Sequence, residues 1–263
     1  MLKKRLIPKL LIRNRTVGNA IRPVLVTTVG FTESISVGDP ISQAKIYEAQ
    51  LADELVVLNI DGIELRKNAS LLKLIERLAS ETFMPLTVGG GVRSIEDFEA
   101  LLHCGADKVC INTSAIRSPA LIHDAANRFG AQCVVVSVDF RTDAVGNAVV
   151  MINHARDSTS LRVKEWVETA VRAGAGEILL TDADRDGAGS GLNCEVAREV
   201  VSSIDVPVVI SGGCGTAEHF VRGFLDGGVE GVAAGTYFCF RDQNPMQTRS
   251  HIKNSGIPIR MET

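Results

Sequence analysis

The feature that most restricts the fold of this chain is an internal repeat. The segment MPLTVGGGVRSIEDF at 84–98 matches VPVVISGGCGTAEHF at 206–220, and ADELVVLNID at 52–61 matches AGEILLTDAD at 175–184. In the longer pair, each copy is a short apolar run that leads into a glycine turn and an amphipathic stretch. Such a repeat indicates two similar halves of one architecture.

Short runs rich in Val, Ile and Leu recur along the whole chain and alternate with amphipathic stretches of helical period. Near-continuous apolar runs of this kind are typical of parallel strands covered by helices. The eight runs lie at 6–12, 54–60, 86–90, 108–112, 133–139, 177–184, 208–213 and 231–238. The helical patterns include 40–52, 94–106, 119–130 and 216–228. Eight such units in 263 residues predict an α/β fold, a (β/α)8 TIM barrel with a two-fold half-barrel repeat.

We expect one domain over residues 1–263, with half-barrels at about 1–130 and 131–263. Ser94, followed three residues later by Asp97, predicts a helix N-cap, and Thr216 holds the equivalent place in the second half. Three glycines fit helix C-terminal ends, namely Gly105, Gly130 and Gly227.

Charge and composition exclude several classes of function. The net charge is −3 and no basic block is present, so nucleic acid is not an expected partner. No run approaches 18 apolar residues, so no membrane span is expected. The six scattered cysteines form no CxxC pair and predict reduced thiols in a cytoplasmic protein. The histidines lack metal-ligand spacing, and no metal or cofactor is expected.

Glycine clusters follow strands at corresponding places in the two halves. Glycine lets backbone N–H groups approach an anion, and a following helix N-terminus adds a favourable dipole. The clusters are Gly89, Gly90 and Gly91 after the third strand, Asn112, Thr113 and Ser114 after the fourth, Gly212 and Gly213 after the seventh, and Gly235 with Thr236 after the eighth. They could serve only as tight turns, but their symmetric placement favours two phosphate sites, one in each half.

Carboxylates at strand ends are the candidate acids and bases. Asp139 ends the fifth predicted strand, where a carboxylate after an apolar run faces the pocket. Three more acids follow the sixth strand, at Asp182, Asp184 and Asp186. For Asp182 and Asp184, a loop-forming role and a functional role are equally compatible with the pattern. Thr181 and Ser211, also at strand ends, could donate hydrogen bonds to a substrate.

Charged residues begin four of the predicted strands and should point toward the N-terminal end of the barrel. Two are basic and two acidic, so a closed ring of salt bridges can form: Arg5, Glu54, Lys108 and Glu177. Such a ring could neutralise the barrel floor, or it could plug or gate an opening. The residues alone do not choose between these roles.

Motifs in order along nearly the whole chain resemble the cyclase subunit of imidazole glycerol phosphate synthase. They are RLIP (5–8), GDP (38–40), DELV (53–56), TVGGG (87–91), GADKVCINT (105–113), VVVSVD (134–139), GAGEILLTDADRDG (174–187) and SGGCGTAEHF (211–220). The resemblance implies a two-fold repeated barrel that receives ammonia from a glutaminase subunit docked on its N-terminal face. It also implies that the ammonia reaches a bis-phosphorylated ribulosyl intermediate.

The resemblance also assigns roles to individual residues. It implies an ammonia gate in the four-residue ring and a glutaminase-facing position at Asp107. It further implies phosphate contacts at Gly91, Asn112, Thr113, Gly187, Gly213 and the segment 234–236.

Three positions depart from the family pattern. The family uses a catalytic aspartate at the end of the first strand and another at the end of the fifth. The fifth-strand residue is Asp139, but Leu11 stands at the first-strand position and cannot transfer a proton. Asn59 replaces an aspartate, and Asn19 stands where the family has a lysine.

An apolar residue at this point of the first strand is found in a divergent second-copy branch of the family, called glycosyl amidation-associated protein. Members of that branch act with a glutaminase-like partner and an adenylating amidotransferase, and help to convert a sugar acetamido group into an acetamidino group for surface polysaccharides. The resemblance implies a heterodimer with a glutaminase and a phosphorylated or nucleotide-linked sugar substrate. The alternatives are an authentic cyclase and a non-catalytic ammonia conduit.

The segment 13–38 is expected to be a long loop after the first strand. Its length and its Thr, Ser and Gly content permit closure over a substrate, but they do not require it.

Overall fold

A computed structural model describes residues 3–18, 20–240 and 244–260. Its parallel strands form a closed barrel, because the last strand in the chain, β12, pairs with the first, β1, with Arg5 opposite Gly231. The barrel strands, in chain order, are β1 (Arg5–Val17), β4 (Leu55–Asn59), β5 (Leu86–Gly89), β6 (Lys108–Ile111), β7 (Val134–Thr142), β10 (Glu177–Asp182), β11 (Val208–Ser211) and β12 (Gly231–Ala234). The predicted (β/α)8 TIM barrel is confirmed.

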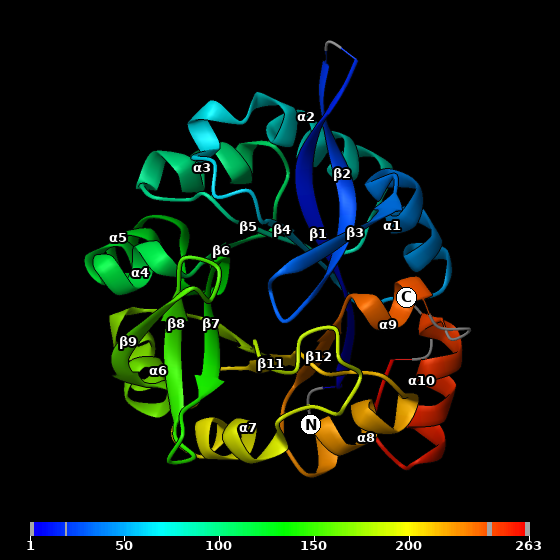
Figure 1. Cartoon of the computed structure of the whole chain (residues 1–263), viewed down its shortest axis with the longest axis vertical. Helices are drawn as coiled ribbons and strands as arrows, with labels where there is room; N and C mark the ends of the chain where they lie inside the picture. The colour runs from blue at the N-terminus through cyan, green and yellow to red at the C-terminus, as the bar shows by residue number, and fades with distance from the viewer. Residues whose placement is uncertain (1–2, 19, 241–243, 261–263) are drawn as a thin grey trace.

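Helices lie around the outside of the barrel (Figure 1). They are α1 (Pro40–Ala49), α2 (Ala69–Glu81), α3 (Ile95–His103), α4 (Thr113–Arg117), α5 (Ala120–Phe129), α6 (Val163–Ala173), α7 (Cys194–Val201), α8 (Ala217–Leu225), α9 (Thr236–Phe240) and α10 (Pro245–Asn254), with short 3-10 turns at η1 (Leu65–Lys67) and η2 (Ala131–Cys133). The eighth predicted strand was too long, since 236–238 begin α9.

Strand β1 shows why the sheet has two different apolar faces. Leu6, Leu10 and Ile12 pack in the large core between strands and helices. Ile7 packs in a second cluster with inward residues of the other strands, such as Cys110 and Leu179. Because side chains alternate along a strand, the odd-numbered residues of β1 point into the barrel.

Helix ends confirm the predicted N-cap positions at Ser94 and Thr216 and the glycines Gly105 and Gly130 after α3 and α5, whereas the glycine after α8 differs. Ser94 and Asp97 form a reciprocal capping box at the start of α3. Thr216 lies at the N-cap of α8, but its side chain makes no capping hydrogen bond there. After α8 the left-handed conformation belongs to Gly228, with φ of 73°, and not to the predicted Gly227.

The expected loop at 13–38 is instead mostly β structure. Strand β1 continues to Val17 and pairs with β2 (Ala20–Val29), which pairs with β3 (Glu33–Gly38). This antiparallel extension projects beyond the barrel (Figure 1). A second extension follows β7 and consists of β8 (Ala148–Ile152) and β9 (Asp157–Arg162). These segments are strands because each pairs with the next segment of the chain in an antiparallel hairpin, with Val17 opposite Ala20 and Thr142 opposite Ala148.

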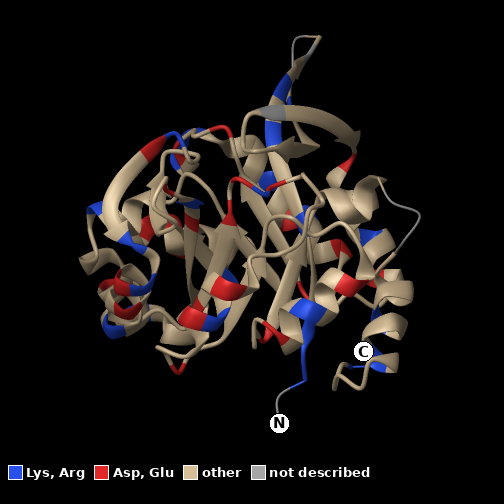
Figure 2. Ribbon diagram, turned by 60° about the horizontal axis from the view of Figure 1, so that its bottom comes forward, with Lys and Arg blue, Asp and Glu red and all other residues tan. Residues whose placement is uncertain are grey.

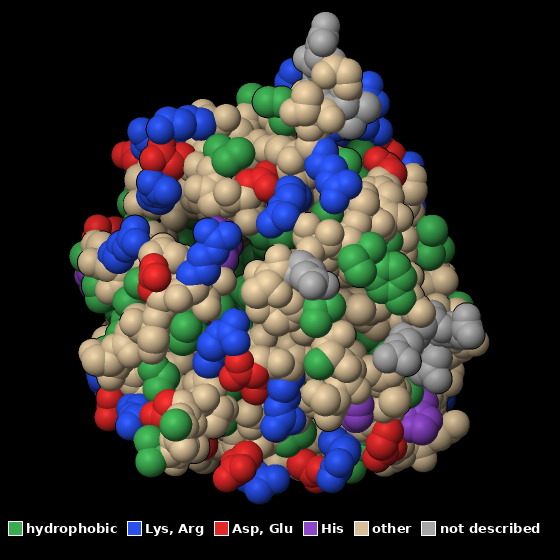
Figure 3. Space-filling view, in the orientation of Figure 1, with side chains coloured by type: hydrophobic (Ala, Val, Ile, Leu, Met, Phe, Trp, Pro, Cys, Tyr) green, Lys and Arg blue, Asp and Glu red, His purple; other side chains and the backbone are tan. Residues whose placement is uncertain are grey.

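Charged residues of both signs are interspersed along the ribbon of the chain (Figure 2). In the space-filling view, basic side chains are spaced around the middle of one face, and several have acidic neighbours (Figure 3). Among the described residues, no helix is long and apolar enough to span a bilayer.

Candidate active site

The four charged residues at the strand starts form a closed ring of ion pairs. Arg5 reaches Glu54 at 2.8 Å and Glu177 at 2.5 Å. Lys108 reaches the other oxygens of the same two carboxylates, at 3.2 and 2.8 Å. Each acid therefore bridges both bases across the N-terminal end of the barrel.

Electrostatics favour the charged state of this ring. Burial would by itself lower the pKa of Arg5, but the carboxylates of Glu177 and Glu54 raise it above its ordinary value overall. An always-charged guanidinium between two carboxylates keeps the ring ionised. Asp107 lies exposed next to the ring, and its carboxylate accepts a hydrogen bond from the Leu86 backbone.

An apolar layer lies directly above the ring inside the barrel. Its buried members come from strands all around the lumen: Ile7, Val56, Cys110, Val135, Leu179, Val209 and Ala233. Burial raises the pKa of the Cys110 thiol to about 12, so this residue stays neutral. The layer separates the charged floor from the polar groups at the other end.

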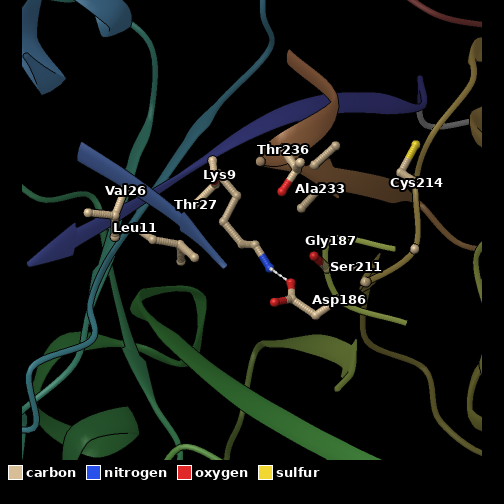
Figure 4. A pocket seen from close by; sticks show the side chains of 14 residues that line it. Lys9, Leu11, Val26, Thr27, Asp186, Gly187, Ser211, Cys214, Ala233 and Thr236 are labelled. Carbon is tan, nitrogen blue, oxygen red and sulfur yellow. Dashed lines mark ion pairs between the residues drawn. The ribbon is translucent and has the colours of Figure 1, made fainter. Parts of the chain in front are cut away.

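A pocket opens at the C-terminal ends of the strands (Figure 4). Its walls bring together the predicted residues of the second half: Asp186, Gly187, Ser211, Gly212, Gly213, Gly235 and Thr236. Lys9, Leu11, Val26 and Thr27 of the first two strands form the opposite side. The internal repeat predicted correctly that these glycine turns lie at one end of the barrel. In the folded chain they line one cavity.

Close packing explains why glycine occupies the turn after β11. Gly213 has φ of 100°, and a Cβ atom there would lie 2.2 Å from the carbonyl oxygen of Gly191. Gly212 has φ of 90° and would clash with the carbonyl of Asp182 at 2.3 Å. Both positions need glycine for backbone reasons, which leaves their main chain exposed to the pocket.

Asp139 lies within β7 and not at its end as predicted, because the strand continues to Thr142 by pairing with β8. It does not line the pocket described above, and neighbouring polar groups hold its carboxylate. Asn112 donates a hydrogen bond from Nδ2 to Oδ2 of Asp139 at 2.7 Å. Burial raises the pKa of Asp139 to about 6, opposed by the positive charge of Lys9 and supported by the negative charge of Asp186. A carboxyl with this pKa can exchange protons near neutral pH.

The three acids after β10 have three different environments. Asp182 is buried and accepts hydrogen bonds from the backbone of Asp184 and from the Asn193 side chain, so it stabilises its own loop. Asp184 is exposed and pairs with Arg141. Asp186 alone of the three lines the pocket. The sequence pattern had left the roles of Asp182 and Asp184 open.

The glycine turn of the first half lies apart from this pocket. Gly90 and Gly91 pack against the carbonyl oxygens of Asn59 and Ile63, and neither lines the cavity. Thr113 accepts a hydrogen bond from the backbone of Asn153.

Two more predicted residues, Thr181 and Asn112, do not line the pocket. Thr181 is buried on β10, opposite both Asp139 and Ser211 in the sheet register. Asn112 contacts Asp139, and its buried Oδ1 has no hydrogen-bond partner within the described ranges of the chain. The first-half phosphate site therefore stays a prediction.

Sequence reasoning did not select Lys9 as a site residue, although it lies in the pocket wall. Its side chain is 5% exposed, and its Nζ lies 4.0 Å from Oδ1 of Asp186. The sequence did contain an indication of its role, because a lysine inside an otherwise apolar strand is costly to bury and is rarely there without a function. Leu11, two residues further along the same face, is 8% exposed.

The two other positions that depart from the family pattern are Asn59 and Asn19. Asn59 is buried, and its Nδ2 has no partner among the described residues. Asn19 lies outside the described residues.

A closed barrel with a charged ring at one end and a glycine-lined pocket at the other is the architecture of the (β/α)8 class, with the pocket at the C-terminal ends of the strands. The chain belongs to the family described as "Histidine biosynthesis protein", which it matches over residues 5–244.

Two similar proteins span the full length of the chain. One, from Prochlorococcus marinus (strain MIT 9313), is named "Putative imidazole glycerol phosphate synthase subunit hisF2"; it is 45% identical over 262 residues, which cover 100% of both chains. The other, from Geobacillus kaustophilus (strain HTA426), is named "Imidazole glycerol phosphate synthase subunit HisF" and is 39% identical, covering 99% of this chain and 100% of its own. Both names describe a subunit of imidazole glycerol phosphate synthase.

Proposed function

We propose that this chain is a synthase subunit that passes ammonia from a glutaminase subunit through the barrel to support the glutamine-dependent amidation of a sugar. The product would be an acetamidino group made for surface polysaccharide. The observation that carries the proposal is the combination of a complete ring with Leu11 in the pocket wall. Delivery of ammonia is retained, while one proton-transfer group of the cyclase reaction is absent.

The path between the two ends supports transport of a neutral molecule. Ammonia would enter at the ring formed by Arg5, Glu54, Lys108 and Glu177 and cross the apolar layer above it. Apolar walls disfavour ammonium and water, so they favour ammonia that arrives unprotonated. The pocket at the far end offers glycine turns for a phosphate group of a phosphorylated or nucleotide-linked sugar.

A glutaminase subunit would dock on the N-terminal face and form a heterodimer with this chain. The exposed Asp107 beside the ring is available to such a partner. A separate adenylating amidotransferase would complete the amidation. The six free cysteines fit a cytoplasmic setting.

Two alternative functions make different use of the same residues. An authentic cyclase would work with Asp139 alone at the mouth, and loss of one of two proton-transfer groups costs roughly 10²–10⁴ in rate. A non-catalytic conduit would use only the ring and the apolar layer. Asp139 is retained, accepts a hydrogen bond from Asn112 and has a raised pKa. These features favour chemistry in the barrel over a pure conduit.

The first experiment supplies the purified barrel with the bis-phosphorylated ribulosyl substrate and ammonium salts. Little or no imidazole formation is expected. A rate comparable to that of an authentic cyclase would overturn the amidation proposal in favour of histidine biosynthesis.

The second experiment compares Lys108→Ala and Asp139→Asn in glutamine-dependent amidation by the assembled system. Loss with both variants is expected if the chemistry takes place in the barrel. Loss with Lys108→Ala alone would identify a conduit. Lys164→Ala, on the exposed side of α6, is the matched control for removal of a lysine.

A further inference from the structure

A two-stranded arm extends one wall of the pocket beyond the barrel. The arm consists of the described residues 13–18 and 20–24, where β1 pairs with β2 after its last barrel contact, Ile12 with Asn59. At the base of this pairing Leu11 lies opposite Val26, and both residues line the pocket. The arm projects from the rest of the molecule (Figure 1).

Arg15 and Arg22 lie directly opposite each other on the arm, and both are exposed. Residues opposite each other in an antiparallel pair share a face of the sheet. Side chains two apart on a strand also share a face, so the two arginines lie on the face that carries Leu11. Four residues of a strand span about 13 Å, and the arginine pair therefore lies roughly that far beyond the pocket wall.

The arginine pair has no counter-charge of its own. Within the described ranges of the chain, neither guanidinium makes an ion pair or a hydrogen bond. Arg13, at the base of the arm, differs, because it lies 3.5 Å from the carboxylate of Asp61 and donates a hydrogen bond to Ser34. Like charges directly opposite each other on a sheet are destabilising. A negatively charged group from outside the chain would remove this repulsion.

Positive charge extends from the arm to the turn between β8 and β9. Arg156 in this turn is exposed, and its side chain has no ion-pair partner in the part of the chain that the structure describes. Burial lowers the pKa of His154, and the positive charges of Arg156 and Arg13 lower it further, while Asp61 opposes them. This side of the mouth therefore favours a negatively charged partner.

The size of the basic surface indicates which kind of anion fits. A membrane or a nucleic acid presents a broad sheet of negative charge, whereas the arm is two strands wide and the net charge of the chain is −3. Acidic residues are interspersed with basic ones over the rest of the molecule (Figure 2). A guanidinium pairs with a carboxylate through two parallel hydrogen bonds, and arginine is enriched at protein interfaces. The arm is therefore suited to a small group of carboxylates on another protein.

We propose that the arm docks the acidic surface of a second protein, whose carboxylates pair with Arg15 and Arg22 beside the mouth of the barrel. That protein is the adenylating amidotransferase, an identification that rests on the proposed function. Docking there would place its active site at the end of the ammonia path, on the face opposite the one that the glutaminase would occupy.

The first test measures binding of a fluorescein-labelled decaglutamate peptide to the full chain by fluorescence anisotropy at low ionic strength, where exposed pairs are least screened. Arg22→Glu should weaken binding by about tenfold or more, because it repels the peptide and also neutralises Arg15 across the strand pair. Lys164→Glu, which makes the same charge change on the exposed side of α6, is the matched control and should bind as the unaltered protein does. Equal effects of the two variants would overturn the proposal.

Arg22→Gln tests the same contact without reversing the charge, so its loss of binding should be smaller than that of Arg22→Glu. Thermal unfolding shows whether both variants are folded, and Arg22→Glu should be at least as stable as the unaltered protein because an opposite-charge pair replaces a like-charge pair. Vesicles of phosphatidylcholine with phosphatidylserine and a thymidine oligonucleotide are the competing probes. An equal or larger dependence on Arg22 for either one would overturn docking of a protein in favour of a membrane or a nucleic acid.

The second test links the arm to the proposed partner. In glutamine-dependent amidation by the assembled system, Arg22→Glu should require about tenfold more amidotransferase to reach the half-maximal rate, and Lys164→Glu should require no more than the unaltered chain. The same requirement in both variants would show that the amidotransferase does not dock on the arm. Absence of amidation with the unaltered proteins would contradict the proposed function, whereas the peptide measurement would still decide whether the arm binds an acidic partner.

Discussion

Asn112 Nδ2 lies 2.7 Å from Asp139 Oδ2, and this hydrogen bond joins the residue that follows β6 to a residue within the neighbouring barrel strand β7. The interaction stabilises the charged carboxylate at the position where proton transfer is expected. Asp186 acts in the opposite sense, since its negative charge raises the pKa of Asp139. The proton affinity of this carboxyl is therefore adjustable by two neighbours.

The first prediction concerns these two neighbours. Asn112→Ala should raise the pKa of Asp139 above about 6, and Asp186→Asn should lower it, because the two changes remove opposite influences. The measurement is a ¹³C NMR titration of the Asp139 carboxyl. Asn127→Ala, at an exposed position on α5, is the control. Shifts of the same sign in both variants would contradict this account.

The second prediction concerns stability against pH. The pKa of Asp139 is raised from 3.8 to about 6, so between these values the folded state holds a proton that the unfolded state has lost. The contribution of Asp139 to the free energy of unfolding should therefore fall as pH rises through this window. Urea unfolding at several pH values should show a shallower fall for Asp139→Asn. Identical slopes in the two proteins would show that another group controls this range.

The third prediction concerns the ring. Glu177→Gln leaves Arg5 and Lys108 with one carboxylate in place of two, and the Glu177 side chain is only 7% exposed. We expect the free energy of unfolding to fall by about 3 kcal/mol, near the lower end for breaking a buried pair. Denaturant unfolding measures it, with Glu165→Gln on the exposed face of α6 as the control. A loss below about 0.5 kcal/mol would mean that water screens the ring fully.

The fourth prediction separates backbone strain from crowding in the pocket. Gly213 and Gly146 have similar φ values of 100° and 90°, but a Cβ at Gly146 would have nothing within 4 Å. Gly146→Ala should cost about 1 kcal/mol from φ alone, whereas Gly213→Ala should cost about 3 kcal/mol or more. Thermal unfolding compares the two. Phosphate titration should show weaker binding in Gly213→Ala alone, and equal effects would argue against a phosphate cradle there.

The fifth prediction restores a carboxyl to the first strand. Leu11→Asp should raise imidazole formation from the bis-phosphorylated ribulosyl substrate by roughly 10²-fold if the missing acid limits the reaction. Leu11→Asn has the same shape and cannot transfer a proton, so it should show no gain. A gain in both variants would mean that removing the apolar side chain, and not proton transfer, changed the rate.

Much of the fold is determined locally. The apolar runs, the glycine turns and the Ser94–Asp97 cap predicted the barrel, because strand alternation and helix capping depend on residues a few positions apart. The family relationship likewise follows from motifs spread over nearly the whole chain. The start-of-strand charges also identified the members of the ring, since parallel strands in a barrel place their first residues at one end.

The sequence by itself determined the barrel and both of its chemical ends, but only the tertiary structure decided how residues distant in sequence share them. It paired β1 with β2 where a loop was expected, selected Asp186 from three acids, and brought Lys9, Asp186 and Ser211 into the lining of one pocket. Burial and electrostatic interaction depend on distance in space, which the local pattern around Lys9 does not contain. The lysine that interrupts an apolar strand in the sequence lies, in the folded chain, in the pocket wall with its ammonium group toward Asp186.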